Sequence, residues 1–184
     1  MIIILEGIDK AGKSTIARNL AKLLNCRIVK RPRELLPFAD GKMDIVQQYM
    51  FTAELFKKEQ FVIFDRFYPS ELVYSYLRGT DKLYNEANSV WQFEKWFIEK
   101  NKCLIFVIED YEDEIQKRFV QDKEDYLRTE DVHEIIVRYE VFKTLSKADV
   151  IMLPATLNFM DKMERILSEI AHNTCTIDIE EDEL

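Results

Sequence analysis

Gly7, Gly12, Lys13 and Ser14 have the spacing G-x-x-x-x-G-K-S, directly after an apolar run. The two glycines allow backbone angles and close approach that a Cβ would block, so the loop amides can surround an anion. A helix that begins at Lys13 adds the positive end of its dipole. In this pattern the lysine reaches the β- and γ-phosphates of a nucleoside triphosphate, and the serine hydroxyl binds Mg²⁺. The spacing predicts a nucleotide-binding loop formed by Gly7, Ala11, Gly12, Lys13, Ser14 and Thr15.

An acid and a base, Asp65 and Arg66, follow a second apolar run at 61–64. A carboxylate at the end of a buried strand can hold a water on Mg²⁺ or accept a proton. A guanidinium beside it can bind phosphate oxygens through two parallel hydrogen bonds. We therefore expect Asp65, with Ser14, to serve the metal ion and Arg66 to bind phosphate.

The hydrophobic pattern predicts an α/β fold. Short apolar runs predict buried parallel strands at 2–6, 27–31, 61–65, 103–108 and 150–153. The segments between them predict helices at 13–24, 44–58, 70–77, 86–99, 112–121, 131–145 and 157–171. Alternating strands and helices form a parallel sheet covered on both faces, with ligands at the carboxyl ends of the strands. In the helix at 44–58 we expect Val46, Met50, Leu55 and Phe56 to face inward.

Length, charge and cysteine content indicate the domain organisation and the surroundings of the protein. The chain has 184 residues, which fits one domain at 1–175 followed by an acidic tail at 176–184. The formal net charge of −8 means that the overall field does not steer the protein to DNA. The three cysteines lack metal-ligand spacing, which indicates reduced thiols and a cytoplasmic protein. No apolar run approaches membrane length, so we expect no membrane association.

A GTPase switch is disfavoured by the sequence. Such proteins carry an N-K-x-D guanine motif after a late strand. Here Asn101 and Lys102 are followed by Cys103 and Leu104, so the aspartate is missing. Phosphoryl transfer is therefore the better interpretation of the loop at 7–14.

The stretch from Leu5 to Thr15 resembles the start of thymidylate kinases, and Asp65-Arg66-Phe67 resembles their D-R-[YF] motif. The resemblance extends to the wider group of thymidylate and deoxynucleoside kinases, and the run at 65–71 is most similar to short virus-encoded members. It implies a P-loop kinase fold with a helical lid, ATP as phosphate donor, Mg²⁺ and a homodimer.

The resemblance also implies roles for single residues. Asp9 would bind the acceptor's sugar hydroxyl or position its phosphate, and Lys10 would stabilise the transferred group. Asp65 would hold Mg²⁺ and water, while Arg66 would bridge the donor and acceptor phosphates. These four residues, with Lys13 and Arg118, are the expected catalytic set.

The acceptor side is predicted through the same resemblance. Phe51 lies where the family stacks an aromatic ring on the base, and Arg31 or Arg33 would bind the acceptor's 5′-phosphate. Tyr74 is a further candidate for contacting the acceptor base. The position at which the family reads thymine with an arginine is Leu55 here. A leucine cannot donate a bidentate hydrogen bond, which weakens the prediction of thymine specificity.

A lid is expected at about 117–130, after the fourth strand, where nucleotide kinases close over phosphates and exclude water. Arg118 is the main candidate for contacting ATP, and Lys123 and Arg128 are further candidates.

Three functions remain open at this stage. The first is a deoxynucleoside monophosphate kinase that gives a diphosphate. The second is a kinase for a deoxynucleoside, or for a hydroxymethylated pyrimidine base in DNA, with Asp65 or Asp9 as proton acceptor. The third is a nucleotide-binding regulatory protein without efficient transfer.

Overall fold

The computed structural model describes residues 1–30, 44–121, 128 and 130–175. Within this part of the chain, five strands form one sheet in the order β2-β3-β1-β4-β5. All neighbouring pairs are parallel, which confirms the predicted α/β fold. The strands are β1 (Ile2–Glu6), β2 (Arg27–Val29), β3 (Val62–Asp65), β4 (Cys103–Ile108) and β5 (Asp149–Leu153).

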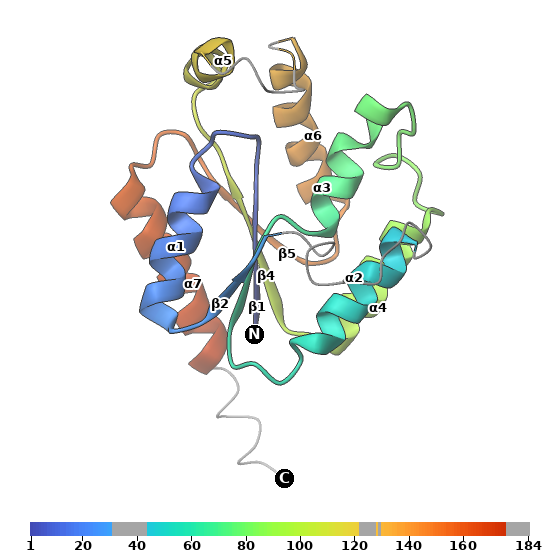
Figure 1. Ribbon diagram of the computed structural model, residues 1–184, viewed down its shortest axis with the longest axis vertical. Helices are drawn as coiled ribbons and strands as arrows, with labels where there is room; N and C mark the ends of the chain where they lie inside the picture. Colours follow the sequence, from blue (N-terminus) through green and yellow to red (C-terminus); the bar gives the residue numbers. More distant parts are fainter. Residues whose placement is uncertain (31–43, 122–127, 129, 176–184) are drawn as a thin grey trace.

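Helices cover both faces of the sheet (Figure 1). α1 and α7 lie side by side on one face, while α2, α3 and α4 lie on the other with α6 beside α3. α5 follows β4 at the end of the sheet where β1 and β4 terminate. The helices are α1 (Lys13–Leu24), α2 (Ile45–Leu55), α3 (Tyr68–Val73), α4 (Ser89–Lys100), α5 (Glu112–Gln121), α6 (Asp131–Leu145) and α7 (Phe159–Cys175).

The burial of the strands explains why the central ones are continuous apolar runs in the sequence. Every residue of β1, β3 and β4 is buried, whereas the edge strands β2 and β5 are partly exposed. Continuous apolar runs fit strands that are covered on both faces. In the part of the chain that the structure describes, no helix combines the length and apolar character needed to span a bilayer.

β1, α1, β4, α5 and α6 have the predicted bounds, whereas the other elements begin or end one to four residues from the predicted position. β2 ends at Val29, two residues before the predicted end. α3 begins at Tyr68 because Pro69 fits the first helical turn, where no backbone N–H is needed. After Val73 the chain tightens into a 3₁₀ helix, Tyr74–Arg78, where a regular α-helix was predicted to continue.

The inward face predicted for α2 was wrong at Met50 and Leu55, whereas Val46 is half-buried against the core. Met50 and Leu55 are 37% and 53% exposed, and the helix instead buries Gln48, Tyr49, Thr52 and Ala53. Phe56, which follows the helix, is buried as expected. Because apolar residues occur around most of the helix, periodicity could not select a face. Tertiary packing selects it: the Tyr49 ring lies 4.8 Å from the Phe67 ring and 5.7 Å from the Phe93 ring.

Candidate active site

The loop between β1 and α1 has the conformation that its glycines make accessible. Gly7 has φ 128°, and a Cβ added there would lie 2.2 Å from the carbonyl oxygen of Ile108. Gly12 has φ 89°, with no atom within 4 Å of an added Cβ. The first position therefore requires glycine for both backbone angle and close packing, and the second for backbone angle alone. Open space beside Gly12, at the start of α1, fits an anion at a helix N-terminus.

Lys13 is buried and points back into this loop. Its side chain is 6% exposed, and Nζ donates a 2.6 Å hydrogen bond to the carbonyl oxygen of Ile8. Burial, with a contribution from Arg66, lowers the pKa of Lys13 to about 7. The carboxylates of Asp9 and two other acids act in the opposite direction. A bound phosphate would supply the negative charge that favours the protonated amine.

Ser14 and Asp65 meet at the predicted metal position. The serine Oγ donates a 2.7 Å hydrogen bond to Oδ2 of the aspartate, although the two residues lie 51 positions apart. Asp65 is buried at the end of β3, beside β1. An hydroxyl and a carboxylate fit Mg²⁺, which keeps several waters and takes its remaining ligands from substrate phosphates. The donor set therefore suits an ion that arrives with a nucleotide.

Arg66 is held rigidly by four residues. Its Nη2 donates to Asp9 Oδ1 at 2.5 Å and to the Tyr74 hydroxyl at 3.2 Å, and its Nη1 donates to Ser70 at 3.1 Å. The guanidinium also lies over the Tyr74 ring, 4.9 Å from its centre. Arg66 has φ 76°, and its amide donates to the carbonyl of Leu5. This left-handed backbone turns the side chain away from the line of β3 and toward the loop.

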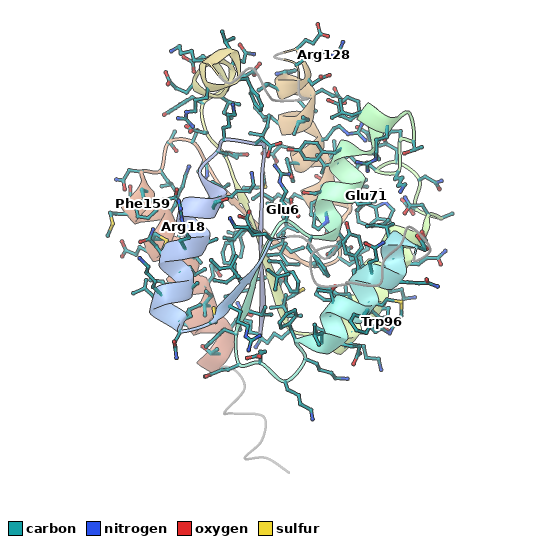
Figure 2. The ribbon with its side chains drawn as sticks, in the orientation of Figure 1. Glu6, Arg18, Glu71, Trp96, Arg128 and Phe159 are labelled. Atoms are coloured by element: carbon teal, nitrogen blue, oxygen red, sulfur yellow. The ribbon has the colours of Figure 1, made fainter. Side chains whose placement is uncertain are left out.

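Glu6 supports the same turn, and our sequence interpretation missed it as a site residue. It is fully buried at the end of β1, near the middle of the molecule (Figure 2). Its carboxylate accepts hydrogen bonds from the Phe67 amide at 2.8 Å, the Ser70 hydroxyl at 2.6 Å and the Tyr139 hydroxyl at 2.9 Å. Burial raises the pKa of Glu6, while Arg66 opposes that shift. An acid that ends an otherwise apolar buried strand was the signal available in the sequence.

Lys13, the Ser14–Asp65 pair and Arg66 line one pocket of about 520 Å³, which we call the central pocket. Its volume is typical of small-molecule sites. The lining combines residues from the P-loop, the end of β2, α2 and the β3–α3 turn: Asp9, Lys10, Gly12, Lys13, Ser14, Thr15, Lys30, Tyr49, Asp65, Arg66, Phe67 and Ser70.

The acceptor side of this pocket differs from the sequence prediction. Phe51 is 49% exposed on α2 and does not line the pocket, whereas Tyr49 from the same helix does. Tyr74 lies behind the guanidinium of Arg66 and not in the lining. Arg31 and Arg33 lie outside the described residues. Lys30, directly before them, lines the pocket and was not singled out in the sequence.

The predicted lid residue Arg118 lies against the P-loop and outside the pocket lining. Its Nη1 donates to the carbonyl oxygen of Lys10 at 2.8 Å and to Asp110 Oδ2 at 2.6 Å. Arg128 instead forms ion pairs with Glu130 and Asp131 at the start of α6 and does not line the pocket. Lys123 lies outside the described residues.

Comparisons with solved structures support the fold. YorR protein from Bacillus subtilis, in complex with phosphorylated GDP, matches with a TM-score of 0.68 and 23% identity over 94% of this chain and 98% of that one. Deoxyadenosine kinase from M. mycoides with bound dATP has a TM-score of 0.62 and 20% identity, over 93% of this chain and 100% of that one. Thymidylate kinase from Ehrlichia chaffeensis has a TM-score of 0.54 and 20% identity, over 95% and 98% of the two chains.

Sequence comparison gives no closer assignment. Neither a protein-family model nor a curated protein sequence matches this chain. Identities of this size show a shared fold and leave the substrate open. Together with the loop at 7–14 and the parallel sheet, the structural matches show that the chain has the P-loop kinase fold.

Proposed function

We propose that this chain is an ATP- and Mg²⁺-dependent kinase that phosphorylates a nucleotide-type acceptor, with a deoxynucleoside monophosphate as the favoured substrate. One observation carries the proposal: the P-loop lysine, the Ser14–Asp65 pair and Arg66 converge on a single pocket that also reaches Lys30. The pocket thus brings cationic groups to the P-loop and to the end of β2. Such a pocket suits two phosphate-bearing ligands.

The residues of this chain divide the work of transfer between them. The loop amides and Lys13 hold the triphosphate, and burial of Lys13 keeps competing water away from its charge. Mg²⁺, when bound, neutralises the charge that builds up on the phosphate oxygens. Arg66 is already oriented by Asp9, Ser70 and Tyr74, so binding phosphate costs it little conformational freedom.

The side-chain partners of Asp9 and Asp65 favour a phosphate acceptor over a hydroxyl acceptor. A hydroxyl acceptor needs a proton-accepting base, whereas an ionised phosphate does not. Asp9 is paired with Arg66, and Asp65 accepts a hydrogen bond from Ser14. Lys30 supplies positive charge on the side where the acceptor would enter, and Arg31 or Arg33 would add to it. A thymidylate-type acceptor is the finer form of this proposal.

The position of Asp9 in the pocket lining also fits a second class of acceptor, one that is phosphorylated on a hydroxyl group. Asp9 lines the pocket as a carboxylate, and it would become a base if a substrate drew Arg66 away from it. Leu55 is exposed and supplies no hydrogen bond for reading a base. The alternative function is therefore a kinase for a deoxynucleoside or for a hydroxymethylated pyrimidine base in DNA.

The segment at about 117–130 is proposed to act as the lid. Arg118 already contacts the P-loop, which supports this assignment. Closure over the phosphates would exclude water and prevent wasteful hydrolysis of ATP.

An acceptor panel tests the proposal. The purified chain is incubated with Mg²⁺ and γ-labelled ATP, together with dTMP, dCMP, thymidine, deoxycytidine or an oligonucleotide carrying hydroxymethylated bases. We expect label in a diphosphate product from a monophosphate acceptor. Label only in nucleoside or oligonucleotide products would select the alternative, and ATP binding without transfer to any acceptor would contradict both. Lys13→Ala serves as the blank that reveals a contaminating kinase.

A further inference from the structure

A reciprocal contact joins the P-loop to α5. Lys10 Nζ donates a 3.0 Å hydrogen bond to the carbonyl oxygen of Arg118, and Arg118 Nη1 donates a 2.8 Å hydrogen bond to the carbonyl oxygen of Lys10. The ammonium group also lies 4.8 Å from the centre of the Phe119 ring. Each residue therefore orients the other's backbone, although 108 positions separate them.

The contact lies at the last turn of α5 that the structure describes, because α5 is described to Gln121 and the Arg118 carbonyl belongs to this turn. A cation at this end also interacts favourably with the negative end of the helix dipole. Lys10 has φ 68°, a left-handed angle that is costly for a residue with a side chain. The hydrogen bond from Arg118 to its carbonyl helps to hold that strained loop.

Asp110 is placed so that it fixes Arg118. It precedes α5 directly after β4, and its Oδ2 accepts a 2.6 Å hydrogen bond from Arg118 Nη1. Its Oδ1 accepts from the Tyr111 amide at 2.9 Å, which fixes the carboxylate in turn. Lys162, at the start of α7, donates to the carbonyl of Glu109 and holds the backbone just before Asp110. Both carboxylate oxygens of Asp110 therefore accept hydrogen bonds, one that orients Arg118 and one that fixes Asp110 itself.

We propose that Asp110 is a positioning residue for phosphoryl transfer. It holds the Arg118 guanidinium on the carbonyl of Lys10 and so locks α5 onto the P-loop. The lock fixes the strained backbone at Lys10 and keeps the positive charges of Lys10 and Arg118 beside the triphosphate end of the central pocket. This inference rests on the proposed kinase function and adds a residue to it that does not line the pocket.

The experiment compares Asp110→Asn with Asp113→Asn. Asp113 is a matched control because it also forms an ion pair on α5, with Lys117 at 3.4 Å, but it is 71% exposed. For Asp110→Asn we expect kcat with ATP to fall about tenfold, the size expected for one charge-assisted hydrogen bond, with the acceptor KM unchanged. Asp113→Asn should leave both constants and the melting temperature unchanged.

A double-mutant cycle distinguishes positioning from general stability. In an Arg118→Ala background, Asp110→Asn should have no further effect on kcat, because its target is gone. Asp110→Glu should recover part of the lost rate. An additive loss, or a loss of kcat that follows a lowered melting temperature, would overturn the assignment.

Hydrogen exchange tests whether Asp110 holds the P-loop backbone, and it requires no measurement of activity. In the ligand-free protein, Asp110→Asn should speed exchange of the amides at residues 8–12, and Asp113→Asn should not. Unchanged exchange at these amides would overturn the assignment. A wild-type chain that phosphorylates no acceptor would count against the proposed function, while the exchange result would still decide the role of Asp110.

Discussion

At the P-loop end of the central pocket, the functional groups come from the turn after β1 and from the last residue of β3 and the turn that follows it. At the other end they come from separate elements, with Lys30 after β2 and Tyr49 from the middle of α2. The first end is organised by backbone angles at Gly7, Gly12 and Arg66. The second depends on which face of a helix packs inward.

We infer that the P-loop end of the pocket carries out phosphoryl transfer and that the other end selects the acceptor. Transfer of a phosphoryl group needs fixed geometry, which strained backbone and hydrogen-bonded side chains provide. Choice of acceptor depends on side chains whose position follows from helix packing, so it can vary without disturbing the P-loop. Substitutions at the P-loop end should therefore impair turnover with every acceptor, and those at the other end should change acceptor binding alone.

The largest effect is expected for Lys13→Met. Loss of the buried ammonium should lower kcat by at least about 100-fold, as for other groups that stabilise transition-state charge. Because burial disfavours the charged form of Lys13, the variant should also melt at the same or a higher temperature. Steady-state kinetics and thermal unfolding test the two parts. Lys22→Met, an exposed lysine on α1, is the control, and normal turnover in Lys13→Met would contradict the mechanism.

Arg66→Lys should lower kcat about 30-fold, because lysine keeps the charge but loses the planar fork that binds phosphate oxygens. The effect should be equal for all acceptors. The matched control is Arg165→Lys on α7, where the arginine pairs with Glu169 at 2.7 Å. An unchanged kcat in Arg66→Lys would remove the assignment of this residue to phosphate.

Tyr49 and Phe51 offer a matched pair on one helix. Tyr49→Leu should raise the acceptor KM about tenfold, the size expected for losing one aromatic contact with a base. Phe51→Leu should leave the acceptor KM unchanged, because this ring lies outside the pocket. The KM for ATP should be constant in both variants. The reverse pattern would restore the sequence-based prediction for Phe51.

A smaller effect is expected from pH. The free protein holds Lys13 with a pKa of about 7, and bound phosphate raises that pKa. Binding therefore recruits a proton when the pH exceeds 7, so affinity falls as the pH rises. Between pH 7 and pH 8 the Kd for ATP should increase about fivefold by linkage. Calorimetry in buffers of different ionisation enthalpy should show proton uptake at pH 8, and a Kd independent of pH would contradict the shift.

The sequence predicted the fold closely because its signals are local. Continuous apolar runs marked β1 and β4 at their observed bounds, and α1, α5 and α6 also begin and end where predicted. The P-loop was readable for the same reason: its conformation depends on the glycines at 7 and 12 themselves.

Other parts of the site depend on tertiary contacts that no local pattern encodes. The burial of Tyr49 in place of Met50 follows from the Phe67 and Phe93 rings, which lie far along the chain. Lys30 lines the pocket only because β2 ends beside β3.

The role of Glu6 as a support for the β3–α3 turn also arises from folding. The carboxylate accepts a hydrogen bond from the Phe67 amide only when β1 and β3 pair.

The most direct test is a crystal structure with an analogue that joins adenosine and thymidine through five phosphates. The proposed function predicts that the phosphates contact the amides between Gly7 and Ser14, with Arg66 within hydrogen-bond distance of a phosphate oxygen and the thymidine beside Tyr49. A loop whose amides contact no phosphate, with the analogue bound elsewhere on the protein, would contradict it.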